Sequence, residues 1–351
     1  MLRNNPIQYL KKTGADVQFH KLLKQVCIYI NHMGNITSIS VLFFTNMDNY
    51  NMGRFLEYTK QYNKSYDTNQ DYEDAFNNFN YNMEWIEKPP SFYQHKLSIN
   101  QFMDIHPSDF HHIYKGYNNP HKTRSCKAFR SETTGLPDSV DWRDHNAVTP
   151  VKDQGQCGSC WSFSATGAME GAWAIRSGAL VSLSEQQLLD CSKFYGDFAC
   201  NGGEMDSAFR YAIDNDMCTE EEDPYKAALD TCIDCEPSVT FTACVDVTSN
   251  NQLHLKEAVA QGPVSVAIEA DTAAFQFYSS GIINNNACGT SLDHGVLVVG
   301  YGEEDGELYW LIKNSWGSSW GDQGYVKIAR SESENDPGVC GIAMQPSYPI
   351  V

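Results

Sequence analysis

The chain has 351 residues, of which 42% are hydrophobic and 20% are charged, which is ordinary usage for a globular protein with a substantial core. Its formal net charge is −19. Up to Gly135 the sequence has 15 Lys and Arg against 12 Asp and Glu, whereas the remainder has 10 against 32. So acidic a remainder argues against nucleic acid as a partner. The mildly basic front part and the acidic remainder are electrostatically matched.

Residues 1–50 are the least informative part of the chain. The stretch from Gln25 to Met47 has no charged residue, but polar residues interrupt it, so a membrane span fits poorly. Ile36 to Phe44 could form the apolar core of a signal peptide. A disordered or misassigned extension is the alternative, and we treat 1–50 as an N-terminal extension or signal region.

The next segment divides into a helical and a polar part. From Gly53 to Pro89 the pattern is helical and rich in aromatic residues. Between Lys115 and Leu136 the chain becomes polar, with Pro, Ser, Thr and Gly, which is typical of an exposed linker and of sites of proteolytic processing.

The stretch from Gln154 to Trp161 reads QGQCGSCW and places Cys160 before a helical pattern. Apolar residues then recur at helical spacing until Arg176, and Gly178 is typical of a helix C-cap. Cys160 is therefore expected in the first turn, where the helix dipole lowers a thiol pKa. The alternative is a buried structural cysteine.

A nucleophilic thiol needs a base and a group that orients the base. His294 and Asn314 follow Cys160 by 134 and 154 positions (294 − 160 and 314 − 160), each beside an alternating apolar run typical of a strand. Ser184 and Gln187 predict a capping box and a second helix. A third helix is expected over 205–213, and beyond Asp246 the pattern changes to strands with Gly turns.

The sequence strongly resembles the papain family of cysteine peptidases, specifically its cathepsin L-like members. The resemblance covers roughly residues 55–351 and rests on segments that occur in the family's order: LPDSVDWR, VKDQGQCGSCWSFSA, SLSEQQLLDC, CNGGEMDSAF, DHGVLVVGYG, YWLIKNSWGSSWGDQGYVKIAR and GVCGIA. The distance from the cysteine to the later His and Asn is part of the family pattern. In the upstream segment, Asp71, Ala75, Phe79, Asn82 and Ile86 match the family's pro-region helix in part, and Asn100, Phe102 and Asp104 match its second motif.

The resemblance implies an α+β fold with two subdomains, a helical half and an antiparallel, β-barrel-like half, with the active-site cleft between them. It implies an inhibitory pro-segment over 51–135 and a mature peptidase over 136–351, divided into a helical subdomain (about 146–247) and a sheet subdomain (about 248–351). We expect a zymogen whose pro-segment inhibits it, and we expect acid to weaken pro-segment attachment by protonating carboxylates such as Asp104.

The resemblance also implies the roles of the site residues. Cys160 attacks the peptide carbonyl, His294 holds its proton, Asn314 orients His294, and the Gln154 amide stabilises the oxyanion. The expected substrate-binding residues are Gly202, Gly203, Met205, Ala267, Leu292, Gln345 and Trp316, the last of which shields the Asn–His bond. The pocket for the second substrate residue before the cut is largely apolar, so Phe or Leu is expected there.

Twelve cysteines indicate an oxidising compartment. The resemblance implies the pairs Cys157–Cys200, Cys191–Cys232 and Cys288–Cys340, and leaves Cys218, Cys235 and Cys244 unassigned. We expect no metal or cofactor, peptide and protein substrates, no nucleic acid partner, a monomer, and a lysosomal, vacuolar or secreted location. The alternatives are a redox dithiol or zinc site built on Cys157, Cys160, Cys232 and Cys235, and a catalytically silent homologue that binds or inhibits through peptide recognition.

Overall fold

The computed structural model describes residues 38–118, 126–131, 135–236, 238–284 and 287–351; for 38–49 and 111–112 it describes the backbone alone. The chain forms two compact units, 1–65 and 66–351. The candidate apolar core of a signal peptide, Ile36 to Phe44, begins outside the described residues, and its part from Ser38 onward lies in a described helix. No helix in the described part of the chain combines the length and the apolar character that crossing a membrane requires.

The first unit contains one described helix, α3 (Ser38–Gln61). Phe55 and Tyr58 are buried, and their ring centroids lie 6.0 Å apart. The next helix, α4 (Asn69–Glu87), begins in the second unit. The continuous helical pattern expected from Gly53 to Pro89 is therefore interrupted. Thr68 explains the new start, because its side chain and that of Asp71 form a reciprocal capping box.

The second unit combines helices with one large sheet. Its helices are α4, α5 (Pro107–Ile113), α6 (Cys160–Ser177), α7 (Glu185–Cys191), α8 (Met205–Asp214), α9 (Gln252–Val259) and α10 (Ala273–Gln276), with short 3-10 turns η1 (Ser192–Tyr195) and η3 (Val339–Gly341). Its strands are β1 (Lys96–Leu97), β2 (Lys127–Ala128), β3 (Val140–Asp141), β4 (Ala243–Asp246), β5 (Val264–Ile268), β6 (Tyr278–Ser280), β7 (Ile282–Ile283), β8 (His294–Glu304), β9 (Glu307–Lys313), β10 (Tyr325–Ala329) and β11 (Ser347–Ile350).

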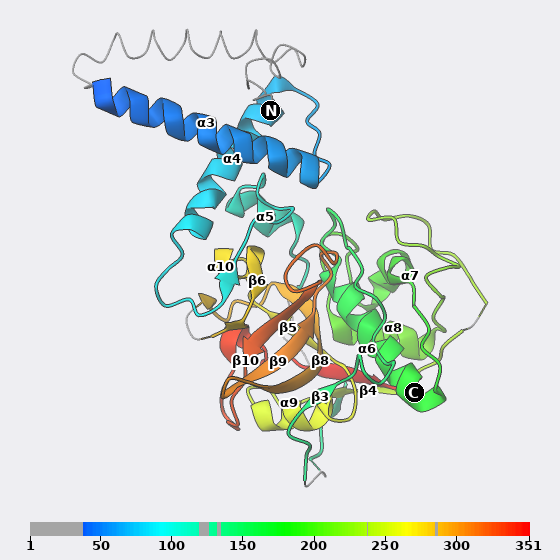
Figure 1. Ribbon diagram of the computed structural model, residues 1–351. Helices are drawn as coiled ribbons and strands as arrows, with labels where there is room; N and C mark the ends of the chain where they lie inside the picture. The colour runs from blue at the N-terminus through cyan, green and yellow to red at the C-terminus, as the bar shows by residue number, and fades with distance from the viewer. Residues whose placement is uncertain (1–37, 119–125, 132–134, 237, 285–286) are drawn as a thin grey trace, which may run out of the picture. The chain divides into compact units, whose positions relative to one another are not determined.

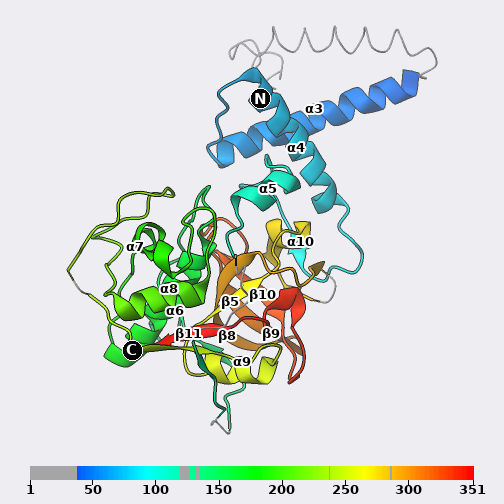
Figure 2. The ribbon, with the colours of Figure 1, turned by 180° about the vertical axis from the view of Figure 1, so that it is seen from behind.

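Three helices and most of the sheet occupy different halves of this unit, as the sequence predicts, whereas α9 and α10 lie on the sheet side (Figures 1 and 2). Helices α6, α7 and α8 lie together on one side, and β5, β8, β9 and β10 lie on the other. Nine of the described strands form one sheet in the order β2-β4-β11-β5-β8-β9-β10-β7, with β3 also on β8, and β1 pairs with β6 in a separate two-stranded sheet. This hydrogen-bonded path is open, so the barrel-like half is not a closed barrel. Two pairs, β2–β4 and β7–β10, are parallel, whereas the other pairs of this sheet are antiparallel.

Helix α6 is the central element, and it is buried almost all round, as its small residues predict. Gly167 lies so close to Leu297 of β8 that an added Cβ would come within 2.7 Å of that side chain. Gly178 ends the helix in the left-handed conformation, with φ of 79°. The capping box expected at the start of α7 is only half formed, because Ser184 accepts from the Gln187 N–H while the Gln187 side chain bonds elsewhere. Close packing of α6 against β8 fixes the start of α6 beside the start of the strand.

Candidate active site

Cys160 is the first residue of α6 and is fully buried. It is the one cysteine of the described residues that is not in a disulfide. Its sulfur lies 3.2 Å from the backbone N–H of Gly295, which donates to it. Since Gly295 directly follows His294, this bond places the thiol beside the start of β8.

His294 and Asn314 come from neighbouring antiparallel strands. His294 begins β8, and Asn314 directly follows β9. The His294 Nε2 and the Asn314 Oδ1 are 2.8 Å apart, the distance of a hydrogen bond in which the imidazole N–H donates. The Trp316 ring lies 4.7 Å from the imidazole centroid and is buried. Both partners are thus held by strand pairing and covered by an aromatic ring.

Gln154 is also buried beside these residues. Its Nε2 donates to the carbonyl of Cys157 at 2.9 Å and lies 3.4 Å from the carbonyl of Tyr114. Its Oε1 accepts from the Ser315 hydroxyl at 2.7 Å, and the Ser315 N–H donates to Asn314 Oδ1 at 2.8 Å. Ser315 therefore connects Gln154 with the Asn–His pair. Ser315 was not among the residues predicted from the sequence, and its position directly after Asn314 is the one signal that could have indicated it.

Burial sets the ionisation of the thiol and the imidazole in this form of the protein. It raises the pKa of Cys160 to about 12, although N–H groups of Gly295, Trp161 and Gly116 lower it. Burial lowers the pKa of His294 to about 4, against the raising effect of its bond to Asn314. The low thiol pKa expected at the helix start is therefore wrong for this form, because burial outweighs the N–H groups, and both groups are neutral at pH 7.

The segment 114–118 lies against the candidate site, with the Gly116 N–H at the Cys160 sulfur, and accounts for part of this burial. The Gly116 carbonyl accepts from the Gly203 N–H at 2.9 Å, and the Asn118 N–H donates to the Gly203 carbonyl at 2.9 Å. On the other side, the N–H groups of Gly116 and Tyr117 lie 3.2 and 3.1 Å from the Asp293 carbonyl. The segment thus pairs with both halves of the unit at once.

Close backbone approach makes glycine necessary in this segment. A Cβ on Gly116 would lie 2.0 Å from the carbonyl oxygen of Gly158. Gly202, with φ of 105°, approaches the Gly116 carbonyl in the same way, and a Cβ there would lie 2.9 Å from its oxygen. Of the two glycines expected to pair with an extended chain, Gly203 forms the backbone bonds, and Gly202 provides the close approach.

Side chains of the segment reach two further sets of groups. Lys115 forms ion pairs with Asp271 at 3.0 Å and with Asp293 at 3.1 Å. The Tyr117 hydroxyl donates to Gln345 Oε1 at 2.7 Å. Burial raises the pKa of Asp293 to about 6, and Lys115 lowers it. Asp293, which directly precedes His294, contacts the segment through its main chain and its carboxylate.

Residues expected to line the substrate pocket lie together. Met205 and Ala267 are buried in one apolar cluster, and Leu292 packs against that cluster. The Tyr117 ring packs against the same cluster, and its hydroxyl bonds to Gln345. The structure thus places an aromatic side chain of the segment among the residues that the resemblance assigned to this pocket.

Upstream residues pack over Trp316. The rings of Phe102 and Phe110 meet the Trp316 ring nearly at right angles, with centroids 5.5 and 5.1 Å away. Asn100 donates to the carbonyl of Gln276 at 2.6 Å, and the Tyr66 hydroxyl donates to Asp104 at 3.0 Å. In the second pro-region motif, Asn100 and Phe102 therefore contact the sheet half directly, whereas Asp104 bonds to Tyr66 within the upstream segment.

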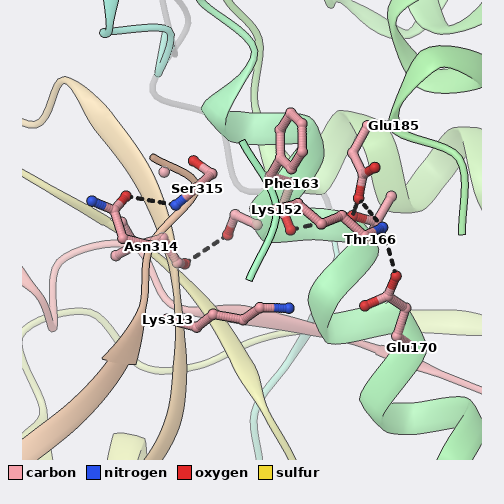
Figure 3. Close-up of a pocket in the computed structure, with 11 residues that line it drawn as sticks. Lys152, Phe163, Thr166, Glu170, Glu185, Lys313, Asn314 and Ser315 are labelled. Atoms are coloured by element: carbon pink, nitrogen blue, oxygen red, sulfur yellow. Dashed lines mark hydrogen bonds and ion pairs between the residues drawn. The ribbon is translucent and has the colours of Figure 1, made fainter. Parts of the chain in front are cut away.

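A buried ion network lies behind Asn314 (Figure 3). Lys152 pairs with Glu170 at 3.0 Å and with Glu185 at 2.7 Å, and Lys313 donates to Thr149 at 2.9 Å. The network lines a cavity of about 20 Å³, together with Asn314 and Ser315. Burial raises the pKa of Glu185 to about 7 and lowers that of Lys313 to about 8. These charges connect α6, α7 and β9 beneath the candidate site.

Five disulfides are formed among the described cysteines. The three expected pairs, Cys157–Cys200, Cys191–Cys232 and Cys288–Cys340, are present. Two further bridges are Cys218–Cys235 and Cys126–Cys244. The proposed redox dithiol and zinc site used Cys157, Cys160, Cys232 and Cys235. Both alternatives fail, because all of these except Cys160 form disulfides with cysteines outside this set.

A buried cysteine at a helix start, beside a His–Asn pair on adjacent strands, is the arrangement of a papain-type cysteine peptidase. The model of the papain family of cysteine proteases matches residues 136–350. The chain belongs to this family.

Known proteins support the assignment over most of the chain. Cathepsin L of Sarcophaga peregrina is 44% identical over 315 residues, covering 84% of this chain and 91% of that protein. A cathepsin L-like peptidase of Aedes aegypti is 48% identical over 273 residues, covering 74% and 79%. Among solved structures, digestive procathepsin L 3 of Tenebrio molitor larval midgut is 40% identical with a TM-score of 0.78, covering 86% of this chain and 99% of that one. The protein is a cathepsin L-like cysteine peptidase with the fold of a pro-form.

Proposed function

We propose that Cys160 is the nucleophile of an endopeptidase and that His294 is its acid–base partner. The Cys160 thiolate attacks the peptide carbonyl, and protonated His294 gives its proton to the leaving amine. Water then hydrolyses the thioester, with His294 as base. Asn314 orients the imidazole through its Oδ1, and Trp316 keeps water from that bond. The bond between His294 and Asn314 beside the only free cysteine of the described chain carries the proposal.

Gln154 and the Cys160 N–H are proposed to stabilise the oxyanion. The Gln154 Nε2 already reaches toward a main-chain carbonyl, that of Tyr114. A carbonyl of a substrate in the same place would gain a donor as its charge develops, and such a donor contributes about 3 kcal/mol to the transition state.

We also propose that 51–135 is the inhibitory pro-segment and 136–351 the mature enzyme. The segment 114–118 resists attack because of how it presents its peptide groups. The N–H of Gly116 faces the thiol, while its carbonyl is held by Gly203. The sulfur therefore meets a donor rather than a carbonyl carbon. The five disulfides suit an oxidising compartment, which fits a lysosomal, vacuolar or secreted location.

Peptide hydrolysis tests the catalytic proposal. The processed protein, separated from its pro-segment, should cleave an unstructured peptide, and Cys160→Ala should reduce kcat by at least about 10³-fold because the covalent step is lost. Ser318→Ala, at an exposed position nearby, should leave activity unchanged. A silent homologue would show no difference between the wild type and Cys160→Ala, and activity that survives this substitution would refute the role of Cys160.

The second residue before the cut should be Phe or Leu rather than Arg. Met205, Ala267 and Leu292 supply apolar contacts, and Gln345 is neutral. Peptide series that differ only at this position should give kcat/KM values roughly 10-fold or more higher for Phe and Leu than for Arg. Gln345→Glu should raise the value for Arg selectively. Comparable cleavage of the Arg and Leu series by the wild type would contradict the assignment of this pocket.

A further inference from the structure

A short segment near the end of the proposed pro-segment forms part of the sheet. Strand β2 pairs in parallel with β4, with Lys127 opposite Val245 and Ala128 opposite Asp246. The Phe129 N–H donates to the Asp246 carbonyl at 2.9 Å, and its ring lies 5.3 Å from that of His254. Because β2 is the edge strand, it shields the main-chain groups of β4.

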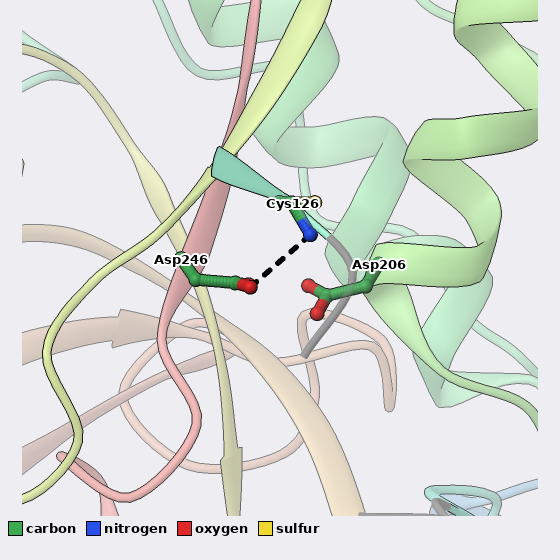
Figure 4. A group of neighbouring side chains, drawn as sticks. All are labelled: Cys126, Asp206 and Asp246. Atoms are coloured by element: carbon green, nitrogen blue, oxygen red, sulfur yellow. Dashed lines mark hydrogen bonds between the residues drawn. The ribbon is translucent and has the colours of Figure 1, made fainter. Parts of the chain in front are cut away.

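The same segment is covalently linked to the sheet. Cys126 forms a disulfide with Cys244, the residue of β4 one position before the partner of Lys127. The Cys126 N–H also donates to the Asp246 carboxylate at 3.1 Å (Figure 4). Asp206 of α8 lies close to both residues. This group has the residue types of a metal site, but the Cys126 sulfur is in a disulfide and is not a free thiolate.

We infer that cleavage near Leu136 does not release the pro-segment, which stays attached to the enzyme through Cys126–Cys244. This inference rests on the proposed boundary between pro-segment and enzyme. The segment that blocks Cys160 ends at Asn118, on the N-terminal side of Cys126, so both lie in the same cleavage product. A cut after the exposed Arg130 would also leave residues 114–118 and Cys126 in the same fragment.

Attachment has a direct effect on inhibition. A tethered segment rebinds at an effective concentration set by the tether, in the millimolar range for a short link. Dilution therefore does not relieve inhibition. Release requires a second event, either a cut between Asn118 and Cys126 or reduction of the bridge. In the reduction, a dithiol attacks one sulfur and forms a mixed disulfide, and its second thiol completes the exchange; Cys126 and Cys244 gain two electrons and two protons, and the dithiol becomes a cyclic disulfide.

The first test does not depend on the activity of the protein. The full-length Cys160→Ala chain is cut briefly with trypsin until the linker between Cys126 and Leu136 is cleaved, then denatured without reductant and weighed by mass spectrometry. We expect the fragment containing Cys126 to remain joined to the enzyme part and to separate when a dithiol is added. Separation without reductant, or alkylation of Cys126 and Cys244 before reduction, would overturn the inference even if the chain is a peptidase.

The second test measures inhibition after self-processing in the absence of reductant. A roughly 100-fold dilution should leave the wild type inhibited, whereas Cys126→Ser/Cys244→Ser should recover activity, because its pro-segment can dissociate. The inference fails if the two proteins recover equally on dilution. If the double variant does not fold, recovery of activity on dilution is compared for the wild type before and after brief dithiol treatment. Equal recovery in these two samples would also contradict the inference. Loss of all activity in every sample, with the mass result as expected, would instead count against the proposed function.

Discussion

At the scale of single residues, the site is a chain of hydrogen bonds that runs through Ser315. The hydroxyl of Ser315 holds the Oε1 of Gln154, and its N–H holds the Oδ1 of Asn314, which in turn accepts from His294. The Gln154 amide has its Nε2 directed at main-chain carbonyls because its Oε1 is fixed. Ser315 is therefore a positioning residue that acts on Gln154 and Asn314.

Ser315→Ala should lower kcat without a comparable change in KM. The substitution removes one buried hydrogen bond, worth about 1 kcal/mol, which corresponds to roughly fivefold in rate if the Gln154 amide loses its orientation. Steady-state kinetics on one peptide measure both parameters. Ser318→Ala is the matched control, because the same change there is made on the surface. An unchanged kcat, or a rise in KM alone, would show that Ser315 does not orient the oxyanion donor.

Local pattern placed three candidate site residues on their elements, whereas the resemblance to the papain family supplied the other candidates and the roles. Cys160 precedes a pattern of helical spacing, and His294 and Asn314 flank strands of alternating apolar residues, so local periodicity located each of them. Ionisation could not be predicted in this way. The thiol pKa depends on burial by residues 114–118, which are distant in sequence from Cys160.

At the scale of elements, residues 114–118 pair with both halves of the second unit through main-chain bonds, and close approach there depends on glycine. A Cβ on Gly116 would meet the Gly158 carbonyl, and a Cβ on Gly158 would meet the carbonyls of Lys115 and Cys200, so neither position has room for a side chain. The contacts on both sides are main-chain bonds, to Gly203 and to Asp293, which do not depend on side-chain identity. Backbone geometry therefore holds the segment over Cys160.

Gly116→Ala should make the uncut precursor partly active. Its Cβ would lie 2.0 Å from a backbone oxygen of Gly158, and backbone atoms cannot move aside without separating the segment from the enzyme. Hydrolysis of a small peptide by the uncut protein at neutral pH measures the effect, expected to be roughly tenfold or more above the wild type. Gly53→Ala is the control, since nothing lies within 4 Å of a Cβ there. Equal latency of the two variants would mean that 114–118 does not block the site.

The break between α3 and α4 and the strand β2 were not predicted from local sequence pattern. The break between α3 and α4 was missed because the aromatic periodicity continues across it, although the Thr68–Asp71 capping box was present as a signal. Strand β2 has two exposed residues and no alternating apolar pattern, so nothing in its sequence indicates a strand. It forms because a disulfide and the edge of β4 hold it.

At the scale of the whole molecule, one lysine of the mildly basic front part pairs with carboxylates of the acidic remainder. Lys115 pairs with Asp271 and Asp293, which are far from it in sequence. The cysteine pairing was predicted only where the family pattern supplied it. Cys126 and Cys244 are 118 positions apart, and composition alone cannot choose a partner among so many cysteines.

The reactivity of Cys160 should change when residues 114–118 leave the site, because these residues help to bury the thiol. In the precursor the thiol pKa is about 12, so few molecules hold a thiolate at pH 7. Without residues 114–118, water returns to the site, the burial that raises this pKa and lowers that of His294 is reduced, and the proton can move from sulfur to imidazole. The thiolate should then persist well below pH 8.5.

The most direct test is the rate of Cys160 alkylation by iodoacetamide from pH 5 to pH 9. Mass spectrometry follows the alkylation in the uncut precursor and in the processed protein. The processed protein is first separated from its pro-segment by brief reduction, and the reductant is then removed. We predict that at pH 6 the processed protein reacts roughly 100-fold faster or more than the precursor, and that His294→Ala abolishes this advantage. A processed protein that reacts only above pH 8, as an ordinary thiol does, would contradict the proposed Cys160–His294 pair.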